Sequence, residues 1–266
     1  EIANESLILG GSNDQFDDGA TRYNQIMGAG GPYTGTENDV RQVIPTAGTI
    51  KDFYVKLNID PGTAPDAYTL TVRWNGATVA QSLIVTIVAD ATTGNDLVHN
   101  LVVAPYDRIT LMVTPVSSPA EMPIACWGMT FVADVDGESV VLGGSNGDLD
   151  DTATEYHFVT PPYPQVWTAN EAFRHMLGQV CTITKLHIKI NDVPGAGNSY
   201  TFTLRVADAA SNVVAVVTGA ASTIGNSGAL EDTVANDEYM GLHVVPDDTP
   251  TVRDAYWGFV SYRQPG

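Results

Sequence analysis

The segment ESLILGGSN at residues 5–13 recurs as ESVVLGGSN at residues 138–146, 133 positions further along the chain. Trp127-Gly128 recurs in the same way as Trp257-Gly258, at an offset of 130. Other matches follow in the same order: residues 17–18 with 150–151, 20–21 with 153–154, 49–50 with 182–183, 55–58 with 188–191, and 68–73 with 200–205. Such self-similarity is the signature of a repeated structural unit. The sequence therefore predicts an internal duplication, with its boundary at residues 133–137.

Each repeat has the apolar pattern of β-strands. In residues 52–58, Phe53, Val55 and Leu57 alternate with Tyr54 and Lys56, which is the period of a half-buried strand. The counterpart predicts Leu186, Ile188 and Ile190 inside, with His187 and Lys189 outside. Further strands are expected at residues 68–74, 79–88, 97–103, 108–114 and 126–132, with a hairpin turn at Asn75-Gly76. Residues 168–177 are the best candidate for one or two helical turns.

Short strands at regular spacing, separated by Gly and Pro turns, favour a sandwich or a barrel. We therefore expect an all-β protein made of two tandem, homologous, antiparallel β-sandwich domains. Jelly-roll and immunoglobulin-like sandwiches both suit the spacing, and the order of the strands does not follow from the sequence. The two domains are expected at residues 1–135 and 136–266.

The charge of the chain restricts its partners. Its 266 residues include 31 acidic and 12 basic side chains, a formal net charge of −19. This charge repels phosphate backbones and anionic lipids, so neither nucleic acid nor membrane insertion is expected, and no apolar run has the length of a membrane helix. The same charge keeps a secreted or assembled surface soluble. Because the chain begins at Glu1 rather than Met, we expect a processed, exported protein.

An acidic loop follows the first strand of each repeat. Carboxylates that lie close together in a loop are ligands that Ca²⁺ prefers, so these loops are candidate calcium sites. Asp and Asn also favour turns without any metal, and the spacing is not that of an EF-hand loop. The candidate calcium ligands are Asp14, Asp17, Asp18, Asp148, Asp150 and Asp151.

Other residues of interest each have a plain structural alternative. Lys56 and Lys189 could form isopeptide crosslinks, but both lie on the polar phase of their strands. The aromatic side chains Tyr33, Tyr163 and Trp167 could stack on sugars or simply pack, and Trp127 and Trp257 are expected in the cores. Asn4 begins a glycosylation triplet, Asn4-Glu5-Ser6. The two cysteines, Cys126 and Cys181, are too few for a disulfide framework, and the sequence does not say whether they pair.

No catalytic motif is present in the sequence. The five histidines, His99, His157, His175, His187 and His243, have no metal-ligand spacing. Neither a nucleophile elbow nor a phosphate-binding loop occurs. We therefore expect no enzymatic activity and no cofactor other than Ca²⁺.

The first strand suggests a mechanism of assembly. Residues 1–9 form a chain terminus that ends in an apolar strand, and a terminal strand can complete the sheet of a neighbouring subunit. If such donation does not close into a ring, it gives a filament. The alternative is that the strand stays in its own sandwich. The candidate assembly strand consists of Glu5, Ser6, Leu7, Ile8 and Leu9.

The phrase YTLTVRWNG at residues 68–76, after a Pro-Gly loop, resembles β-sandwich modules of phage and environmental surface proteins. The tandem pair with a terminal Leu-Ile-Leu-Gly-Gly strand also resembles subunits of extracellular prokaryotic fibrils that assemble by donor-strand exchange. The resemblance implies a non-enzymatic structural subunit that polymerises with itself. Two alternatives stay open: a virion surface or decoration protein, and a carbohydrate-binding module whose partner is a glycan.

Overall fold

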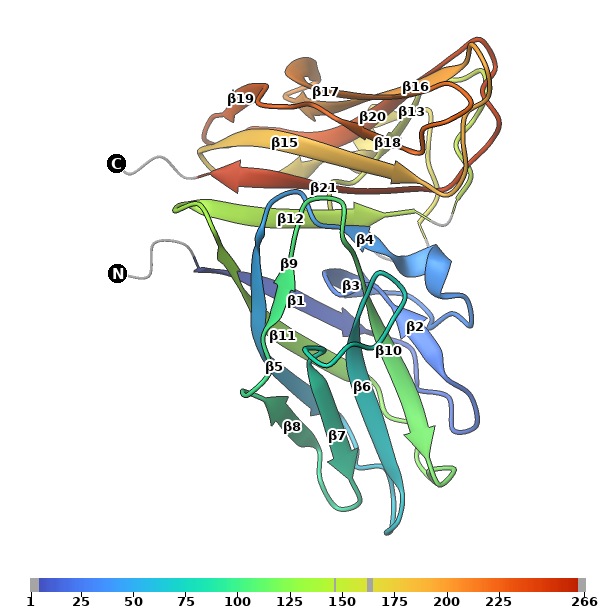
Figure 1. Cartoon of the computed structure of the whole chain (residues 1–266), viewed down its shortest axis with the longest axis vertical. Coiled ribbons are helices and arrows are strands. Elements are labelled where there is room, and N and C mark those ends of the chain that lie inside the picture. The colour runs from blue at the N-terminus through green and yellow to red at the C-terminus, as the bar shows by residue number, and fades with distance from the viewer. Residues whose placement is uncertain (1–4, 146, 162–164, 263–266) are drawn as a thin grey trace.

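The computed structural model describes residues 5–145, 147–161 and 165–262. Asn4 and Tyr163, named above as candidates, lie outside these residues. The described residues form four β-sheets, two from residues 5–133 and two from residues 138–262 (Figure 1). We call these two parts the first and the second sandwich.

In the first sandwich the elements are β1 (Glu5–Ser12), β2 (Arg22–Asn24), β3 (Gly28–Gly30), the 3₁₀ helix η1 (Glu37–Val40), β4 (Gln42–Val43), β5 (Gly48–Leu57), β6 (Ala67–Trp74), β7 (Ile84–Val88), β8 (Thr93–Asp96), β9 (Leu101–Val103), β10 (Arg108–Val116) and β11 (Ala125–Ala133). One sheet has the order β3-β1-β11-β5-β8, with β9 also paired to β5. The other has the order β2-β10-β6-β7, with β4 also paired to β10.

In the second sandwich the elements are β12 (Glu138–Gly144), β13 (Glu155–His157), the 3₁₀ helix η2 (Glu171–Arg174), β14 (Met176–Leu177), β15 (Cys181–Ile190), β16 (Ser199–Val206), β17 (Ala209–Thr218), β18 (Ile224–Asn226), β19 (Glu231–Val234), β20 (Tyr239–Asp247) and β21 (Ala255–Tyr262). Its sheets have the orders β12-β21-β15-β18 and β13-β20-β16-β17, with β19 paired to β15 and β14 paired to β20.

The two sandwiches have matching strand orders. In each, the first and last strands are neighbours in one sheet, and the second strand lies beside the penultimate one in the other. Eight principal strands in this order form a jelly roll. All named pairings are antiparallel except the short pairing of β3 with β1. The all-β sandwich prediction is confirmed; the duplication stays a prediction, and the matching orders are what it requires.

The predicted alternation along the long strands holds inside each core. Phe53, Val55 and Leu57 are buried in the first sandwich, and Leu186, Ile188 and Ile190 are buried in the second. The prediction that His187 is exposed was wrong, because Tyr106 of the first sandwich covers its ring at a centroid distance of 4.5 Å. The outer face of β15 is therefore part of a contact between the two sandwiches.

The predicted hairpin turn is present, but several predicted strand boundaries differ from the structure. Asn75-Gly76 forms a two-residue turn that joins Trp74 to Ala77, with φ of 52° and 83°. The following strand, β7, starts at Ile84 rather than at Val79, and residues 97–100 separate β8 from β9 instead of forming a strand. The helical candidate at residues 168–177 contains one short turn, η2.

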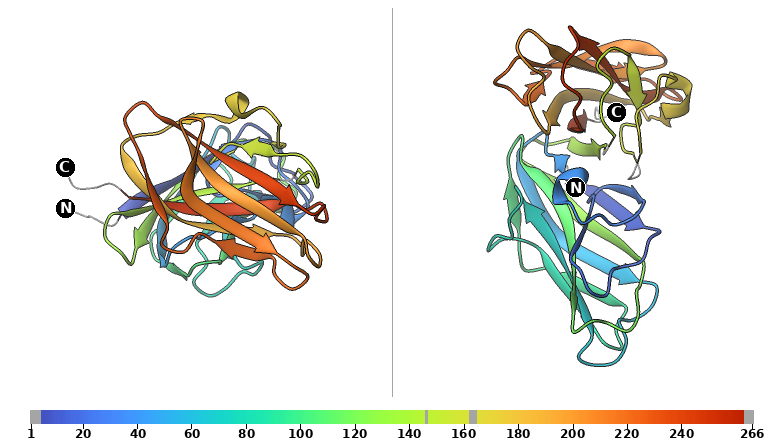
Figure 2. Two further views of the ribbon diagram at one scale, coloured as in Figure 1. Left: turned by 90° about the horizontal axis from the view of Figure 1, so that it is seen from above. Right: turned by 90° about the vertical axis from the view of Figure 1, so that its right-hand side faces the viewer.

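The second sandwich is stacked on one end of the first (Figure 1 and Figure 2, right). Its sheet that contains β12, β21 and β15 faces the first sandwich, and β4 contacts all three of these strands. No helix within the described residues has the length and apolar character needed to cross a lipid bilayer.

Candidate assembly surface

The candidate assembly strand, β1, lies in its own sandwich. It pairs with β11 from Glu5 opposite Val132 to Gly11 opposite Cys126. Ile8 is fully buried in the core, while Leu7 and Leu9 point outward and are 64% and 58% exposed. Two large apolar side chains on one strand form an exposed apolar surface of the kind that marks interaction sites.

The equivalent strand of the second sandwich, β12, is covered on the side that is exposed in β1. It pairs with β21 from Glu138 opposite Tyr262 to Gly144 opposite Tyr256, the same register as β1 with β11. Val140 and Leu142 stand where Leu7 and Leu9 stand in the first sandwich, yet they are 4% and 0% exposed. Both side chains pack into the core cluster of the first sandwich.

The cover over β12 is the β4 loop, which we define as residues 39–47. The Thr46 hydroxyl donates to a carboxylate oxygen of Glu138 at 2.6 Å, and Lys185 forms an ion pair with the same carboxylate. Beside the loop, the Gln25 amide donates to the carbonyl oxygen of Gly144 at 3.0 Å. The Thr46 hydrogen bond thus links the loop directly to β12, and the Gln25 hydrogen bond holds the neighbouring segment on the same strand.

Glycines allow this close approach. A Cβ at Gly258 would collide with the carbonyl oxygen of Val43, and one at Gly144 would lie 2.9 Å from the carbonyl oxygen of Arg41. Within the part of the chain that the structure describes, the equivalent glycines of the first sandwich have no backbone carbonyl of another loop this close. Among the described residues, a Cβ at Gly128 would meet only the end of the Leu9 side chain within 4 Å, and the three atoms nearest to a Cβ at Gly11 all belong to β11, at 3.6 Å or more.

We expect Gly258→Ala to lower the free energy of unfolding by about 2 kcal/mol, because the added methyl group overpacks the contact between the sandwiches. The matched change Gly128→Ala should alter the stability of the monomer by no more than about 0.5 kcal/mol. Urea denaturation of the two variants beside the unchanged protein measures both effects. Equal losses in the two variants would contradict the role assigned to Gly258.

The exposed strand borders an apolar groove of about 620 Å³. The first sandwich lines it with Leu7, Leu9, Gly10, Gly11, Met27 and Gly28, and the second sandwich adds Thr160 and Met176. A second shallow groove of about 360 Å³ continues across β11 and β5, past Tyr54 and Gly128. We call the outer surface formed by Leu7, Leu9, Gly11, Cys126 and Gly128 the β1 face.

The acidic loops are organised as turns. One oxygen of Asp17 accepts from the backbone N–H groups of Gly19 and Ala20, and the other accepts from Arg22 at 2.6 Å. These hydrogen bonds lower the pKa of Asp17. Asp150 accepts in the same way from Thr152 and Ala153, which also lowers its pKa. The structure thus uses two of the six carboxylates to form turns, and calcium binding here stays a prediction.

The remaining acidic candidates lie around these turns. Asp14 accepts from the backbone N–H of Tyr33 at 3.2 Å, and the residues that surround the first loop include the cation Arg22. Asp18 and Asp151 lie beside the turns, and Asp148 is close enough to Asp254 to help raise its pKa.

The aromatic candidates within the described residues are packing residues. Trp127 and Trp257 are buried, and each indole N–H donates to a backbone carbonyl of the equivalent loop. Trp167 is buried against His157 and Trp257, so its ring is not available to stack on a sugar. Tyr33 packs edge-on against Phe16. Lys56 is exposed and donates to Thr92, whereas Lys189 is half-buried at the contact between the sandwiches.

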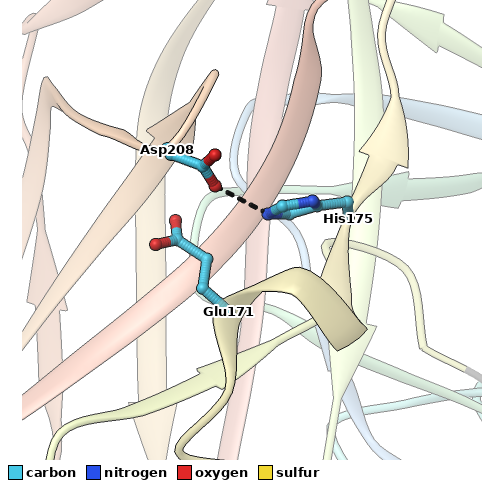
Figure 3. A group of neighbouring side chains, drawn as sticks. All are labelled: Glu171, His175 and Asp208. Carbon is cyan, nitrogen blue, oxygen red and sulfur yellow. Dashed lines mark ion pairs between the residues drawn. The ribbon is translucent and has the colours of Figure 1, made fainter.

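Glu171, His175 and Asp208 form a cluster that the sequence analysis missed (Figure 3). His175 Nε2 lies 2.9 Å from a carboxylate oxygen of Asp208. Both oxygens of Glu171 accept from Arg205, at 2.7 and 3.0 Å, and the His175 ring stacks on Tyr239 at 3.9 Å. The acidic groups already have protein partners, so the cluster is explained as a network that fixes η2 on the second sheet.

Comparison with known proteins does not place the chain in a family: no family description matches it, and no curated protein is similar to it in sequence. Within the described residues, the two sandwiches differ most clearly in that the β1 face is exposed and the equivalent β12 face is covered. The register of the repeated segment in the sequence could have located both faces. It could not have shown that the β4 loop covers one and leaves the other open.

Proposed function

We propose that this chain is a non-enzymatic structural subunit that assembles with copies of itself into an extracellular filament through its first strand. The observation that carries the proposal is the unequal exposure of equivalent side chains, with Leu7 and Leu9 open to solvent where Val140 and Leu142 are covered. An exposed apolar surface on an otherwise strongly acidic protein favours one specific contact over general association.

Strand donation and surface docking are two routes to such an assembly. Donation requires β1 to leave β11, which would uncover the buried side chain of Ile8 and break the antiparallel pairing along the strand. Docking leaves β1 in place and uses only its outer side chains. Both routes depend on the same strand, so the first experiment addresses the strand itself.

The test compares the unchanged protein with the double variant Leu7→Asp, Leu9→Asp by negative-stain electron microscopy. We expect filaments from the unchanged protein and discrete particles from the variant, since two carboxylates on the β1 face cost too much to bury. Truncation of residues 1–9 is a less selective variant, because it also removes Ile8 from the core.

The control is Val88→Asp, Val98→Asp, which adds the same charge at apolar side chains that are 56% and 81% exposed elsewhere on the first sandwich. Filaments should persist in this control. Discrete particles from the unchanged protein across a wide range of concentration would overturn the filament proposal.

A further inference from the structure

We infer that the β1 face of one copy receives the β14 loop, residues 173–180, of a second copy, in the way that the β4 loop is received by β12 and β21 within one chain. This inference rests on the proposed self-assembly and names its occupant. Three observations support it: the two loops are equivalent, the β14 loop is exposed and apolar, and residue changes on the two surfaces match.

The equivalence of the loops follows from strand register. In the first sandwich Gln42 and Val43 pair with Ile109 and Arg108 of β10. In the second, Met176 and Leu177 pair with Met240 and Tyr239 of β20. The next residue of each loop donates its backbone N–H to the equivalent carbonyl, at 2.8 Å in one sandwich and 2.7 Å in the other. Leu177 therefore occupies the position of Val43.

Within the described residues, the β14 loop has exposed apolar side chains on both sides of Met176, which itself borders the groove beside the β1 face of its own chain. Phe173, Leu177 and Val180 are 65%, 75% and 57% exposed. At the equivalent positions of the β4 loop, Val43 and Thr46 are buried and Asp39 is half-buried, and β4 contacts β12, β15 and β21 of the second sandwich. Three large apolar side chains within eight residues are an exposed patch of the kind that a partner surface covers.

The β1 face is preformed for this contact. In the second sandwich, Gly258 and Gly144 leave room for the carbonyl oxygens of Val43 and Arg41. The equivalent residues of the β1 face are Gly128 and Gly11, which also have no side chain. Within the described part of the chain, no contact that a Cβ at Gly128 would make involves the backbone of another segment. The same open backbone would accept the carbonyl oxygen of Leu177 from a second copy.

Two acidic residues at the contact between the sandwiches have apolar counterparts, one in the β14 loop and one beside the β1 face. Within the chain, Asp39 faces the second sandwich, where burial and the charges of Asp148 and Asp39 raise the pKa of Asp254 to about 6. At the equivalent position of η2 stands Phe173, and the position equivalent to Asp254 is Ile124. Two carboxylates that repel each other inside the chain thus have two apolar side chains as their counterparts, and a contact between copies would bury these without that repulsion.

The contact is heterologous, because a loop of one copy meets a different surface of the next. Repetition of such a contact gives a closed ring or an open filament, according to whether the rotation closes. A symmetric dimer in which two β1 faces meet each other is the competing arrangement. It needs no β14 loop, and this difference provides the test.

The test uses two double variants of the full chain. The face variant is Leu7→Asp, Leu9→Asp, and the loop variant is Phe173→Asp, Leu177→Asp. Val88→Asp, Val98→Asp serves again as the charge-matched control. We expect each test variant alone to sediment as a monomer, with an association weakened about 100-fold or more, while the control assembles normally.

The decisive sample is an equimolar mixture of the two test variants. It contains one intact loop and one intact face, so sedimentation velocity should show a 1:1 dimer that grows no further. Normal assembly of the loop variant, or absence of dimers in the mixture, would overturn the inference. Far-ultraviolet circular dichroism of each variant verifies that both sandwiches remain folded.

The outcomes separate this inference from the proposed function. Filaments that are lost in the face variant but kept in the loop variant support the filament and overturn the docking of the β14 loop. Closed rings from the unchanged protein, together with dimers in the mixture, support the docking and overturn the filament. Monomers in every sample overturn both.

Discussion

Leu142→Ala should lower the free energy of unfolding by about 3 kcal/mol, whereas Leu9→Ala should change it by less than about 0.5 kcal/mol. The two leucines are equivalent in strand register, but Leu142 is fully buried beneath the first sandwich and Leu9 is exposed. Truncation of Leu142 removes buried methyl groups and leaves a cavity in the contact between the sandwiches. Urea denaturation at a protein concentration where the chain is monomeric measures both effects.

The comparison is informative because the local sequences are nearly the same. Both leucines precede two glycines, and both lie opposite a glycine of the last strand of their sandwich. A larger loss of stability in Leu142→Ala than in Leu9→Ala therefore measures how much the packing of the β4 loop on β12 contributes. Similar losses in the two variants would contradict the arrangement of the sandwiches described above. A loss at Leu9 that appears only at assembling concentrations would agree with a docked second copy.

The fold was largely predictable because the sequence contains two versions of it. Alternation in residues 52–58 located a strand whose inward side chains are buried, and the repeated ESxxLGGS segment located β1 and β12. Strand order was not predictable, since it depends on contacts between residues far apart in the chain. The pairing of β1 with β11 joins segments more than a hundred residues apart.

The candidate surface was predictable only in part. The sequence identified Leu7 and Leu9 as members of an apolar strand, but alternation within a strand does not reveal what lies outside the sheet. His187 illustrates the same limit. Its place in the alternation predicts a side chain that points outward into solvent, but Tyr106 of the first sandwich buries it. Equivalent positions acquire different surroundings once one sandwich packs on the other, and no local pattern records that contact.

His157 should make the second sandwich sensitive to mild acid. Its ring is fully buried between Trp167 and Trp257, and Nε2 donates to the carbonyl oxygen of Gln165 at 2.9 Å. Burial lowers the pKa of His157 to about 4, well below the usual value of 6.5. Between these two values the unfolded chain binds a proton that the folded chain excludes, so stability falls as the pH falls from 6.5 towards 4.

The expected loss from this residue is about 3 kcal/mol by pH 4, since each unit of pKa shift corresponds to about 1.4 kcal/mol. Asp254 acts in the opposite direction, because its raised pKa favours the folded state as the pH falls below about 6. The overall pH profile therefore does not isolate His157, but comparison with a variant does.

His157→Asn places at this position the residue that its counterpart, Asn24, has in the first sandwich. The variant lacks the titrating ring and keeps Asp254, so the stability difference between the two proteins should shrink by about 3 kcal/mol from pH 7.5 to pH 4. Urea midpoints measured across this range, with tryptophan fluorescence as the signal, give that difference directly. A difference that stays constant with pH would mean that His157 accepts its proton without unfolding, and that the packing around its ring is looser than the contacts with Trp167 and Trp257 require.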